Sequence, residues 1–416
     1  MNNKKEKIII LVILVILGLI IGLFGYDYYK KHNNSNDTNN NAKANSGNIN
    51  TDDGDSDIDW ENYTTKQIEN DGDINITEAG IYTLTGNING TVTVNTEGNV
   101  KLILDNATIK SSNGPAIYIE SADNTVIYLK EETTNTLEDS SNYSNLDEDI
   151  NAVIFSKDDL VFDGTGTLVV KANYEDGIVS KDDLKIINGK YNITTSDDGI
   201  RGKDSVYIID GIFDIDAGGD GIKASNDTDN EKGYVLIENG TFKINSKSDG
   251  IQAITKLVIN NGTFDITSGE GLEATYIIIN DGNIKISASD DGINASKKST
   301  FMTPAIEVNG GNITVNMGQG DTDGFDANGN IYINGGKISV TGQSAFDYDG
   351  EGKINGGTVV VNGQEVTELP NQMMGGGMHG GMRNGNMQAP DMNGTPPDMD
   401  NNQGERQNGN RGGMRK

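Results

Sequence analysis

Apolar and polar residues alternate along the chain in short runs that end at glycine-containing turns. Between residues 74 and 129, apolar side chains occupy every second position in pairs such as Val92 and Val94 or Leu102 and Leu104. A two-residue period bounded by Asn-Gly or Glu-Gly pairs is typical of β-strands joined by tight turns. This stretch shows no 3.6-residue period between helix caps. The pattern therefore predicts β-strands, followed by an acidic loop at 139–149 that bulges outward.

A three-residue phrase then recurs, consisting of an acidic residue, a glycine and a branched or aromatic apolar residue. It stands at residues 176–178, 198–200, 220–222, 249–251, 270–272, 291–293 and 323–325. The steps between the acidic residues are 22, 22, 29, 21, 21 and 32. A basic period of 21 or 22 residues with two longer steps predicts a repeat array with loop insertions.

One repeat contains three short strands and three turns, which cannot bury a core alone. Stacked at the usual strand spacing of roughly 4.8 Å, such units form a parallel β-helix with inward columns of apolar side chains. A left-handed hexapeptide helix needs a period of about 18 residues, and a β-propeller needs about twice the observed period. The sequence therefore predicts an all-β, right-handed parallel β-helix, which is a solenoid.

The N-terminus carries an apolar run behind a short basic segment. Residues 1–7 include Lys4, Lys5 and Lys7, and residues 8–24 are uncharged and apolar. This order predicts a transmembrane signal anchor, so that one N-terminal helix holds the protein in the cell membrane with the β-helix outside. The alternative is secretion after signal cleavage, although no small-x-small cleavage pattern follows the run.

Composition divides the rest of the chain into three parts. Residues 25–59 are rich in Asn, Asp, Ser and Gly, and we expect a flexible linker. The β-helix domain is expected at 60–369. Residues 370–416 are rich in Gly, Met and Asn without apolar alternation, so we expect a disordered tail.

The balance of residue types excludes several kinds of chemistry. The formal net charge is -30, which argues against nucleic acid and anionic membrane surfaces as partners. The chain has no cysteine and two histidines, so disulfides, thiol chemistry and histidine-based zinc sites are not expected. Clustered acidic residues instead suit a divalent cation bound through oxygen.

Two columns of turn residues follow from the repeat. The first consists of Asn-Gly or Asp-Gly pairs at 188–189, 210–211, 239–240, 261–262, 281–282, 309–310 and 334–335. These pairs supply positive φ angles, and stacked asparagine amides can bond one another, so this column is structural. The second column is the acidic residue of the three-residue phrase, where turn formation is also the plainest explanation.

The acidic column differs because stacked carboxylates about 5 Å apart repel one another. Further acids or amides lie beside it or three residues on, where an extended strand directs them to the same outward side. Hard oxygen ligands without His or Cys select Ca²⁺. We therefore expect calcium along this column, with candidate ligands Asp176, Asp197, Asp198, Asp220, Asp249, Glu270, Asp290, Asp291, Asn294, Asp323 and Asp326.

A third turn combines both charge signs. Ser-Lys-Asp-Asp-Leu occurs at 156–160 and 180–184, with a diverged copy at 202–206. A solvated, salt-bridged turn is the ordinary interpretation. Asp182 and Asp204 are secondary calcium candidates.

Several segments together resemble the carbohydrate-binding β-helix family of clostridial-type bacteria, which is related in fold to calcium-dependent pectate lyases. They are residues 100–109, the Gly-Pro-Ala-Ile-Tyr-Ile segment at 114–119, residues 133–137, the Ser-Lys-Asp-Asp-Leu turns, the acidic column and the Gly/Met-rich tail. The stretch at 133–137 is close to the family's Gly-Thr-Glu-Asn-x-Leu but lacks its Gly and Glu. The resemblance implies display at the cell surface, bound calcium, and binding of cellulose or an acidic plant polysaccharide such as pectin or polygalacturonate. It makes residues 60–369 a carbohydrate-binding domain.

We therefore expect a monomeric, non-catalytic polysaccharide-binding protein. Sugars are bound by aromatic faces and polar groups, and the outward aromatic candidates are Trp60, Tyr118, Tyr128, Tyr174, Tyr191, Tyr207 and Tyr276. The residues assigned to carbohydrate binding are Tyr174, Tyr191, Tyr207, Lys181, Arg201, Lys203 and Lys223, the cations serving an acidic glycan.

Two alternatives remain open. A calcium-dependent pectate lyase would use the cation to acidify a sugar proton and Arg201 or Lys223 to remove it. No basic residue stands at the matching places near Asp323, and no catalytic residue is assigned. The other alternative is a structural or adhesin stalk that calcium merely stabilises.

Overall fold

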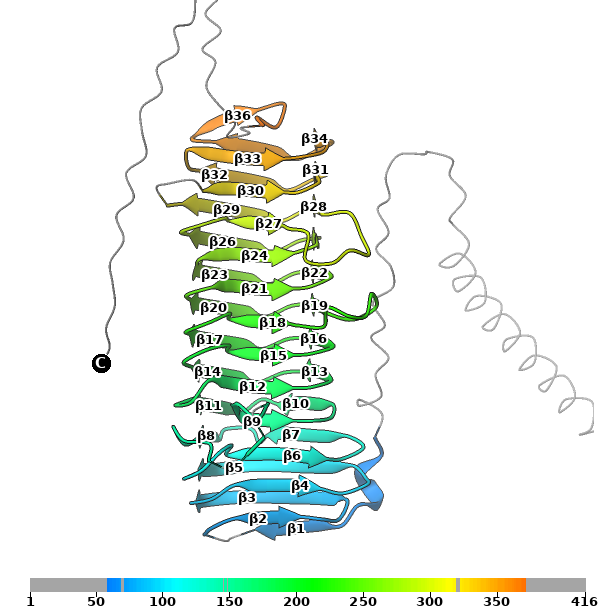
Figure 1. The fold of residues 1–416 in the computed structure, drawn as a ribbon, viewed down its shortest axis with the longest axis vertical. Helices are drawn as coiled ribbons and strands as arrows, with labels where there is room; N and C mark the ends of the chain where they lie inside the picture. The colour runs from blue at the N-terminus through cyan, green and yellow to red at the C-terminus, as the bar shows by residue number, and fades with distance from the viewer. Residues whose placement is uncertain (1–57, 69–70, 145, 148, 319–321, 372–416) are drawn as a thin grey trace, which may run out of the picture. The chain divides into compact units, whose positions relative to one another are not determined.

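A computed structural model describes residues 58–68, 71–144, 146–147, 149–318 and 322–371 (Figure 1). The expected membrane anchor at 8–24, all but the last two residues of the linker, and the tail from residue 372 lie outside these residues. Among the described residues no helix is long and apolar enough to cross a membrane. The helical structure described there is a short 3-10 turn, η2 (Trp60–Asn62).

The described part of the chain winds as a solenoid of parallel strands, three to a coil (Figure 1). One strand of each coil joins a 12-stranded sheet. Its strands are β2 (Ile74–Ile76), β4 (Val92–Asn95), β6 (Ile117–Ser121), β9 (Ala152–Ser156), β12 (Asp176–Ser180), β15 (Ile200–Gly202), β18 (Ile222–Ala224), β21 (Asp249–Ala253), β24 (Glu270–Ala274), β27 (Ile293–Ala295), β30 (Asp323–Ala327) and β33 (Ser344–Tyr348).

The other strands form a 24-stranded sheet that divides into two stacks, because β3 (Gly80–Ile88) and β5 (Val100–Lys110) are long enough to pair in both. The first stack contains β1 (Thr65–Ile68), β7 (Thr125–Leu129), β10 (Leu160–Gly164), β13 (Asp183–Ile186), β16 (Ser205–Ile208), β19 (Tyr234–Ile237), β22 (Lys256–Ile259), β25 (Tyr276–Ile279), β28 (Ala305–Val308), β31 (Asn330–Ile333) and β34 (Gly352–Ile354). The second contains β8 (Thr134–Glu138), β11 (Thr167–Lys171), β14 (Lys190–Thr194), β17 (Ile212–Ala217), β20 (Thr241–Ser246), β23 (Thr263–Ser268), β26 (Asn283–Ala288), β29 (Asn312–Met317), β32 (Lys337–Thr341), β35 (Thr358–Val361) and β36 (Gln364–Val366).

The register of the coils follows the repeat of the sequence. Ile178 pairs with Ile200, and the same column continues through the apolar residue of each later phrase as far as Phe325. The longer steps of 29 and 32 residues include loops at 225–233 and 296–304, which project from the solenoid beside β18 and β27 (Figure 1). The repeat array with loop insertions is thus confirmed as a parallel β-solenoid.

Alternating strands send every second side chain into a continuous core. In β17, β20 and β23 buried and exposed residues alternate without exception. Rings from successive coils stack face to face in this core, with centroids 4.9 Å apart for Tyr191 and Phe213 and 4.7 Å apart for Phe213 and Phe242. These spacings equal the rise between neighbouring strands, so the rings report the same register as the backbone.

An asparagine ladder runs along one turn of the solenoid, as expected. In two of its coils the asparagine in the ladder is the residue before the one that was predicted. Asn280 Nδ2 donates to Asn260 Oδ1 at 2.7 Å, and the ladder continues through Asn309, Asn334 and Asn355. Asn260 and Asn280, rather than Asn261 and Asp281, carry it. The shift arises because the later turns read Asn-Gly-Gly, which moves the positive φ to the second glycine, as at Gly311.

The C-terminal end of the solenoid closes with a reversal of chain direction. Strand β36 pairs with β35 in the antiparallel sense, unlike the parallel pairs before it in the described strands. The segment that follows folds over the last coil, where Tyr348 Oη donates to the carbonyl oxygen of Leu369 at 3.2 Å. Leu369 is buried there.

Candidate functional site

One outward-facing position of the 12-stranded sheet forms a column along the solenoid, in register from coil to coil. We name it the outward column, and it consists of Asn75, Thr93, Tyr118, Phe155, Val179, Arg201, Lys223, Gln252, Glu273, Asn294, Asp326 and Asp347. Its chemistry changes from polar and aromatic, through apolar and cationic, to amide and acidic. Each zone presents a different surface on the same sheet.

The acidic residues of the repeated phrase lie beside this column and support the backbone. Asp176 Oδ1 accepts the N–H of Asp198 at 2.9 Å. In the following coils Asp198 Oδ1 accepts the N–H of Asp220, and Asp220 Oδ1 accepts the N–H of Asp249, both at 2.9 Å. Asp291 does the same for Asp323, also at 2.9 Å. At these four steps the acidic column is therefore a ladder in which a carboxylate accepts the backbone N–H of the next coil.

In the middle coils, two cations of the outward column neutralise this ladder. The Arg201 guanidinium contacts Asp176 Oδ2 and lies 3.8 Å from Asp198 Oδ2. Lys223 Nζ lies 2.7 Å from Asp220 Oδ2 and 3.3 Å from Asp198 Oδ2. Burial alone would lower the pKa of Lys223, but these carboxylates outweigh it and raise the pKa above its ordinary value. Two of the four predicted glycan-binding cations, Arg201 and Lys223, are thus engaged with the ladder.

After Lys223 the outward column contains amides and acids in place of cations, namely Gln252, Glu273, Asn294, Asp326 and Asp347. Carboxylate oxygens of Asp249, Glu270 and Glu273 all lie within 4.8 Å of one another. Burial first, and then the neighbouring carboxylates, raise the pKa of Asp249 to about 7 and that of Glu270 to about 8. The nearby cation is Lys298, whose Nζ lies 2.5 Å from Glu273 Oε2.

Two amide side chains complete this acidic cluster. Gln252 Nε2 contacts Asp249 and lies 3.2 Å from Glu273 Oε2. Asn294 Nδ2 donates to Glu270 Oε2 at 3.1 Å, whereas its Oδ1 is buried without a hydrogen-bond partner. Asn294 is only 7% exposed. Its oxygen is therefore a buried acceptor for which the described residues supply no donor.

The remaining ligands predicted along the acidic column are placed differently. Asp326 follows Asn294 in the outward column, and burial followed by Asp291 and Asp323 raises its pKa to about 7. Asp197 and Asp290 are exposed beside the ladder. Glu273 was outside the predicted ligand set, although its place three residues after Glu270 is the signal that identifies it.

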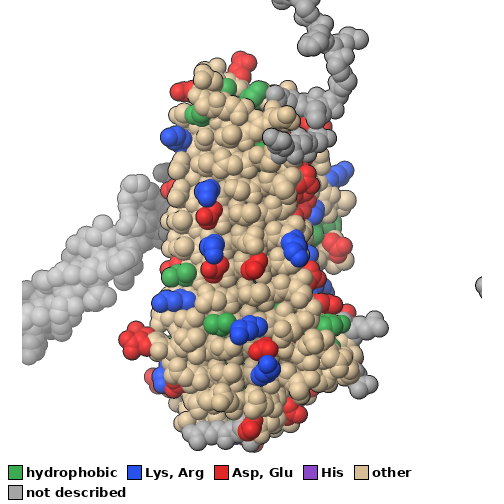
Figure 2. Space-filling view, turned by 90° about the vertical axis from the view of Figure 1, so that its left-hand side faces the viewer, with side chains coloured by type: hydrophobic (Ala, Val, Ile, Leu, Met, Phe, Trp, Pro, Cys, Tyr) green, Lys and Arg blue, Asp and Glu red, His purple; other side chains and the backbone are tan. Residues whose placement is uncertain are grey.

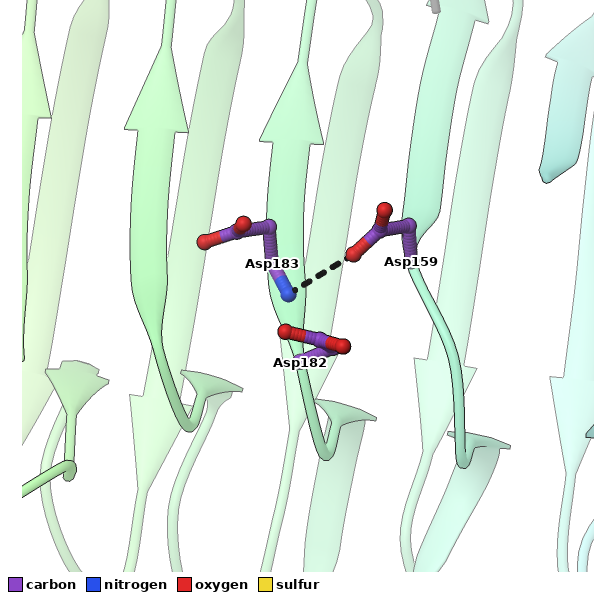
Figure 3. Close-up of side chains that lie close together, drawn as sticks. All are labelled: Asp159, Asp182 and Asp183. Atoms are coloured by element: carbon purple, nitrogen blue, oxygen red, sulfur yellow. Dashed lines mark hydrogen bonds between the residues drawn. The ribbon is translucent and has the colours of Figure 1, made fainter. Parts of the chain in front are cut away.

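A second acidic cluster lies at the mixed turn that precedes the first stack of the 24-stranded sheet. It consists of Asp159, Asp182 and Asp183, whose oxygens also lie within 4.8 Å of one another (Figure 3). Asp183 N donates to Asp159 Oδ1 at 3.1 Å. Of these three, only Asp182 was predicted, and the doubled Asp-Asp of the repeated turn was the signal for the other two.

Asp204, the second candidate at this turn, has partners from the loop at 225–233. Lys232 forms an ion pair with it, and Asn226 Nδ2 donates to Asp204 Oδ1 at 2.6 Å. Burial, followed by a hydrogen bond with Asp204, raises the pKa of Asp182 to about 7. The turn thus combines a salt-bridged part with a part rich in carboxylates.

The three tyrosines predicted to bind sugar differ in their exposure to solvent. Tyr191 is fully buried in the aromatic core stack, and its hydroxyl donates to Asn188 O at 2.8 Å. Its assignment to an outward sugar-binding face is therefore wrong, because the alternation places it on the inward side of β14. Tyr174 is 37% exposed and stacks on Tyr143 with centroids 4.3 Å apart. Tyr207 is half-buried on the outer face of β16.

The other two predicted glycan-binding cations are more accessible. Lys203 is exposed, and Lys181 Nζ lies 3.8 Å from Asp149 Oδ2. Figure 2 views the side of the solenoid at the left of Figure 1, where basic and acidic side chains are scattered over a largely uncharged surface. Ion pairs such as Lys243–Asp214 on β20 and β17, at 3.0 Å, belong to the second stack. The two acidic clusters lie elsewhere, on the 12-stranded sheet and at the turn before the first stack.

Comparison with known proteins gives one family. Over residues 70–324 and 274–382 the sequence matches the family described as "Carbohydrate-binding domain-containing protein". A curated relative of the same description from Acetivibrio thermocellus is 37% identical over 128 residues, which are 29% of this chain and 44% of that relative. The match therefore spans less than half of the relative's length.

A solved structure is similar to part of the chain. It is described as the polysaccharide lyase-like protein from C. thermocellum, as a gadolinium derivative. The two are 36% identical, with a TM-score of 0.47, over 49% of this chain and 84% of that chain.

Proposed function

Because the chain belongs to the family of carbohydrate-binding domain-containing proteins, we propose that it is a non-catalytic polysaccharide-binding protein. The observation that carries this proposal is the extent of the family match, which runs from residue 70 to residue 382 and includes every described strand except β1. The proposed ligands are cellulose or an acidic plant polysaccharide such as pectin or polygalacturonate.

The state of the cations supports binding rather than lyase catalysis. A lyase needs a base that is unprotonated at working pH and free to approach the sugar. Arg201 contacts Asp176, and Lys223 lies between Asp198 and Asp220 with a raised pKa. Both of these candidate bases are therefore engaged with carboxylates, and the raised pKa of Lys223 keeps that residue protonated.

We also propose that the protein binds Ca²⁺ at the acidic cluster of Asp249, Glu270 and Glu273. Calcium takes six to eight oxygen ligands in adaptable geometry, and the three carboxylates are close enough to share one ion. Asn294 borders the same cluster through its Nδ2, and because its Oδ1 has no hydrogen-bond partner, no such bond holds the amide in its present orientation. The raised pKa values of Asp249 and Glu270 support this, since close carboxylates without a cation hold protons instead.

The amides of the cluster are suited to the same ion. Gln252 and Asn294 now direct their nitrogens at the carboxylates. A half-turn of each amide about its last bond would exchange nitrogen for oxygen and add neutral ligands without moving the backbone. When bound, the ion would supply positive charge that offsets the mutual repulsion of the carboxylates.

The setting of this domain in the cell is also a proposal. We infer a single-pass anchor at residues 8–24, with the linker at 25–59 placing a monomeric domain outside the cell and the tail at 370–416 disordered. Secretion after cleavage of the segment is the alternative. We further infer the right-handed sense of winding, since parallel strands joined by a crossover are right-handed in about 98% of cases.

Binding to insoluble polysaccharides, with and without a chelator, tests the function. The protein should be depleted from solution by cellulose or by an insoluble pectin and should release no unsaturated, ultraviolet-absorbing product from polygalacturonate. A calcium-dependent rise in absorbance would establish the lyase instead. Failure of every polysaccharide to deplete the protein, together with a lower melting temperature on chelation, would establish the calcium-stabilised stalk.

Calcium binding is tested separately by thermal unfolding. Adding Ca²⁺ to the chelated protein should raise its melting temperature, because an ion that binds only the folded state stabilises it by mass action. The Glu270→Gln variant should lose most of that rise. Glu365→Gln removes the same charge from an exposed site in β36 and should keep it. Equal rises in both variants would exclude the cluster as the site.

A further inference from the structure

The N-terminal zone of the outward column forms the floor of a pocket of about 280 Å³. Asn75 of β2, Thr93 of β4 and Tyr118 of β6 stand in successive coils, in register. Asn75 is exposed, and Thr93 and Tyr118 are half-buried. Their side chains therefore line up at the spacing of the coils, roughly 4.8 Å, on an open surface.

A loop that the solenoid holds in place makes one wall of this pocket. Asn113 Nδ2 donates to Ser144 O at 3.2 Å, and Asn113 Oδ1 accepts the N–H of Ser144 at 2.8 Å. Leu146 lies so close to Gly114 that a Cβ there would come within 2.5 Å of its Cδ1. Leu146 and Ile150 line the pocket from this side.

The polar residues around the pocket fall into two groups. Thr91 and Ser111 hydrogen-bond to each other at 3.1 Å, and Thr91 Oγ1 also donates to Pro115 O at 2.8 Å, so both serve the fold. The side chains of Asn75 and Thr93 bond to no other described residue. One amide and one hydroxyl on the floor are thus open to a ligand.

The remaining surfaces indicate what that ligand is. The Tyr118 ring lines the pocket, and Lys157 Nζ lies over one face of this ring, 5.7 Å from its centroid. Asp73 accepts the N–H of Thr91 through Oδ1 at 2.9 Å, and it also lines the pocket. A carboxylate wall in a chain of formal charge -30 repels an anion but accepts hydroxyl donors.

We propose that this pocket is a subsite for a neutral sugar unit of a polysaccharide. The Tyr118 ring packs against the C–H face of the sugar, while Asn75, Thr93 and Asp73 hydrogen-bond to its hydroxyls. This proposal rests on the proposed polysaccharide-binding function and adds its place and the charge class of the sugar. The Asp73 carboxylate makes this subsite favour a neutral sugar over a uronate.

The pocket and the acidic cluster are far apart on the same sheet. Six coil steps separate Tyr118 from Glu273 in the outward column, which corresponds to about 29 Å at the usual strand spacing. Screening at physiological ionic strength, with a Debye length of about 8 Å, removes most direct coupling over that distance. Binding of a neutral glycan should therefore persist in a chelator.

The experiment measures binding of cellohexaose to the full chain by calorimetry, with an oligogalacturonate of equal length in parallel and a chelator present. Tyr118→Ala should weaken cellohexaose binding by roughly tenfold or more, as loss of a central aromatic anchor does. Thr93→Val keeps the shape and removes only the hydroxyl, and it should also weaken binding. Tyr332→Ala removes a half-buried outward tyrosine of β31 and should leave binding unchanged.

The outcomes separate this inference from the proposed function. Wild-type binding that survives both pocket substitutions, in variants with unchanged melting temperatures, would overturn the subsite alone. Wild-type binding only to oligogalacturonate would overturn it as well. A wild-type protein that binds no polysaccharide would overturn the proposed function and the subsite together.

Discussion

At the scale of single residues, the two carboxylate oxygens of a ladder aspartate have different partners. In Asp198, Oδ1 accepts the N–H of Asp220, while Oδ2 lies 3.3 Å from Lys223 Nζ. The first bond satisfies a buried backbone donor, which is costly to leave unpaired. The second compensates a charge that burial would otherwise penalise. The same residue therefore supports the coil and balances the surface.

Substitutions at Asp198 should separate these tasks. Asp198→Ala leaves the N–H of Asp220 unpaired and should lower the free energy of unfolding by about 1–3 kcal/mol. Asp198→Asn keeps an acceptor oxygen, while Arg201 and Lys223 retain Asp176 and Asp220 as partners, so its cost should be smaller. The exposed neighbour gives the control, since Asp197→Ala should change stability by no more than about 0.5 kcal/mol. Equal melting temperatures for the Ala and Asn variants would show that the backbone bond contributes little.

At the scale of the coil, the glycine of the repeated phrase sets how closely two coils approach. A Cβ on Gly250 would come within 2.4 Å of Ile266 Cγ2 and 2.5 Å of the carbonyl oxygen of Gly271. The glycine thus lies where the next coil's backbone and the core meet, at the start of β21 and not in an open turn. Close packing of this kind fixes the register that aligns the outward column.

Gly250→Ala should consequently be among the most damaging small substitutions in the array. Overpacking in a rigid core costs about 1–3 kcal/mol, and the backbone carbonyl of Gly271 cannot rotate away. Gly318→Ala is the matched control, because a Cβ there would meet nothing closer than 3.5 Å. Thermal unfolding followed by circular dichroism should show a lower melting temperature for the first variant only. A Gly250→Ala protein as stable as wild type would mean that neighbouring coils can separate without loss.

At the scale of the whole solenoid, charge compensation is uneven from one end to the other. Arg201 and Lys223 balance the ladder in the middle coils. Beyond Asp249 the outward column itself becomes acidic. Burial and mutual repulsion raise the pKa to about 7 for Asp249 and Asp326 and to about 8 for Glu270. Stability therefore depends on pH through these three groups, and also through Asp176 and Asp182, whose pKa values burial raises to about 7.

The sign of that dependence follows from proton linkage. Unfolded carboxyl groups titrate at about 4, so between about pH 4 and 8 the folded protein holds more protons than the unfolded chain. In a chelator, the melting temperature should be highest at the acidic end of this window and should fall as pH rises toward 8. Glu270→Gln should flatten the decline. A melting temperature that rises from pH 5 to pH 8 in the chelated protein would contradict the raised pKa values.

The repeat made the fold predictable, whereas the partners of each site residue depended on register. The strand period and the glycine spacing fixed the coil, because one unit cannot bury its apolar face without the next. The burial of Tyr191 was missed since a tyrosine fits either side of a strand, and only the count from the neighbouring turn decides. The pairing of Arg201 with Asp176 joins residues 25 positions apart, which no local motif encodes.

The pocket was harder still to foresee. Its floor joins residues 75, 93 and 118, which precede the regular part of the array. One wall consists of Leu146 and Ile150, which lie in and directly after the acidic loop at 139–149. The sequence predicted that this loop bulges outward but not which residues it contacts. The position of that loop depends on the hydrogen bond from Asn113 to Ser144 and on the close approach of Leu146 to Gly114. A turn residue and a loop meet there by tertiary packing alone.

The reversal at β36 determines where the solenoid can grow. Every exposed strand edge is a template on which another chain can add by hydrogen bonding. If the last coil ended in parallel strands, the first coil of an identical molecule could pair with them. Molecules would then join end to end into a filament. Strand β36 instead occupies the edge of β35 with the opposite polarity. At the C-terminal end β36 thus covers the parallel edge of the second stack, and we expect it to hinder the end-to-end addition of another molecule to that stack.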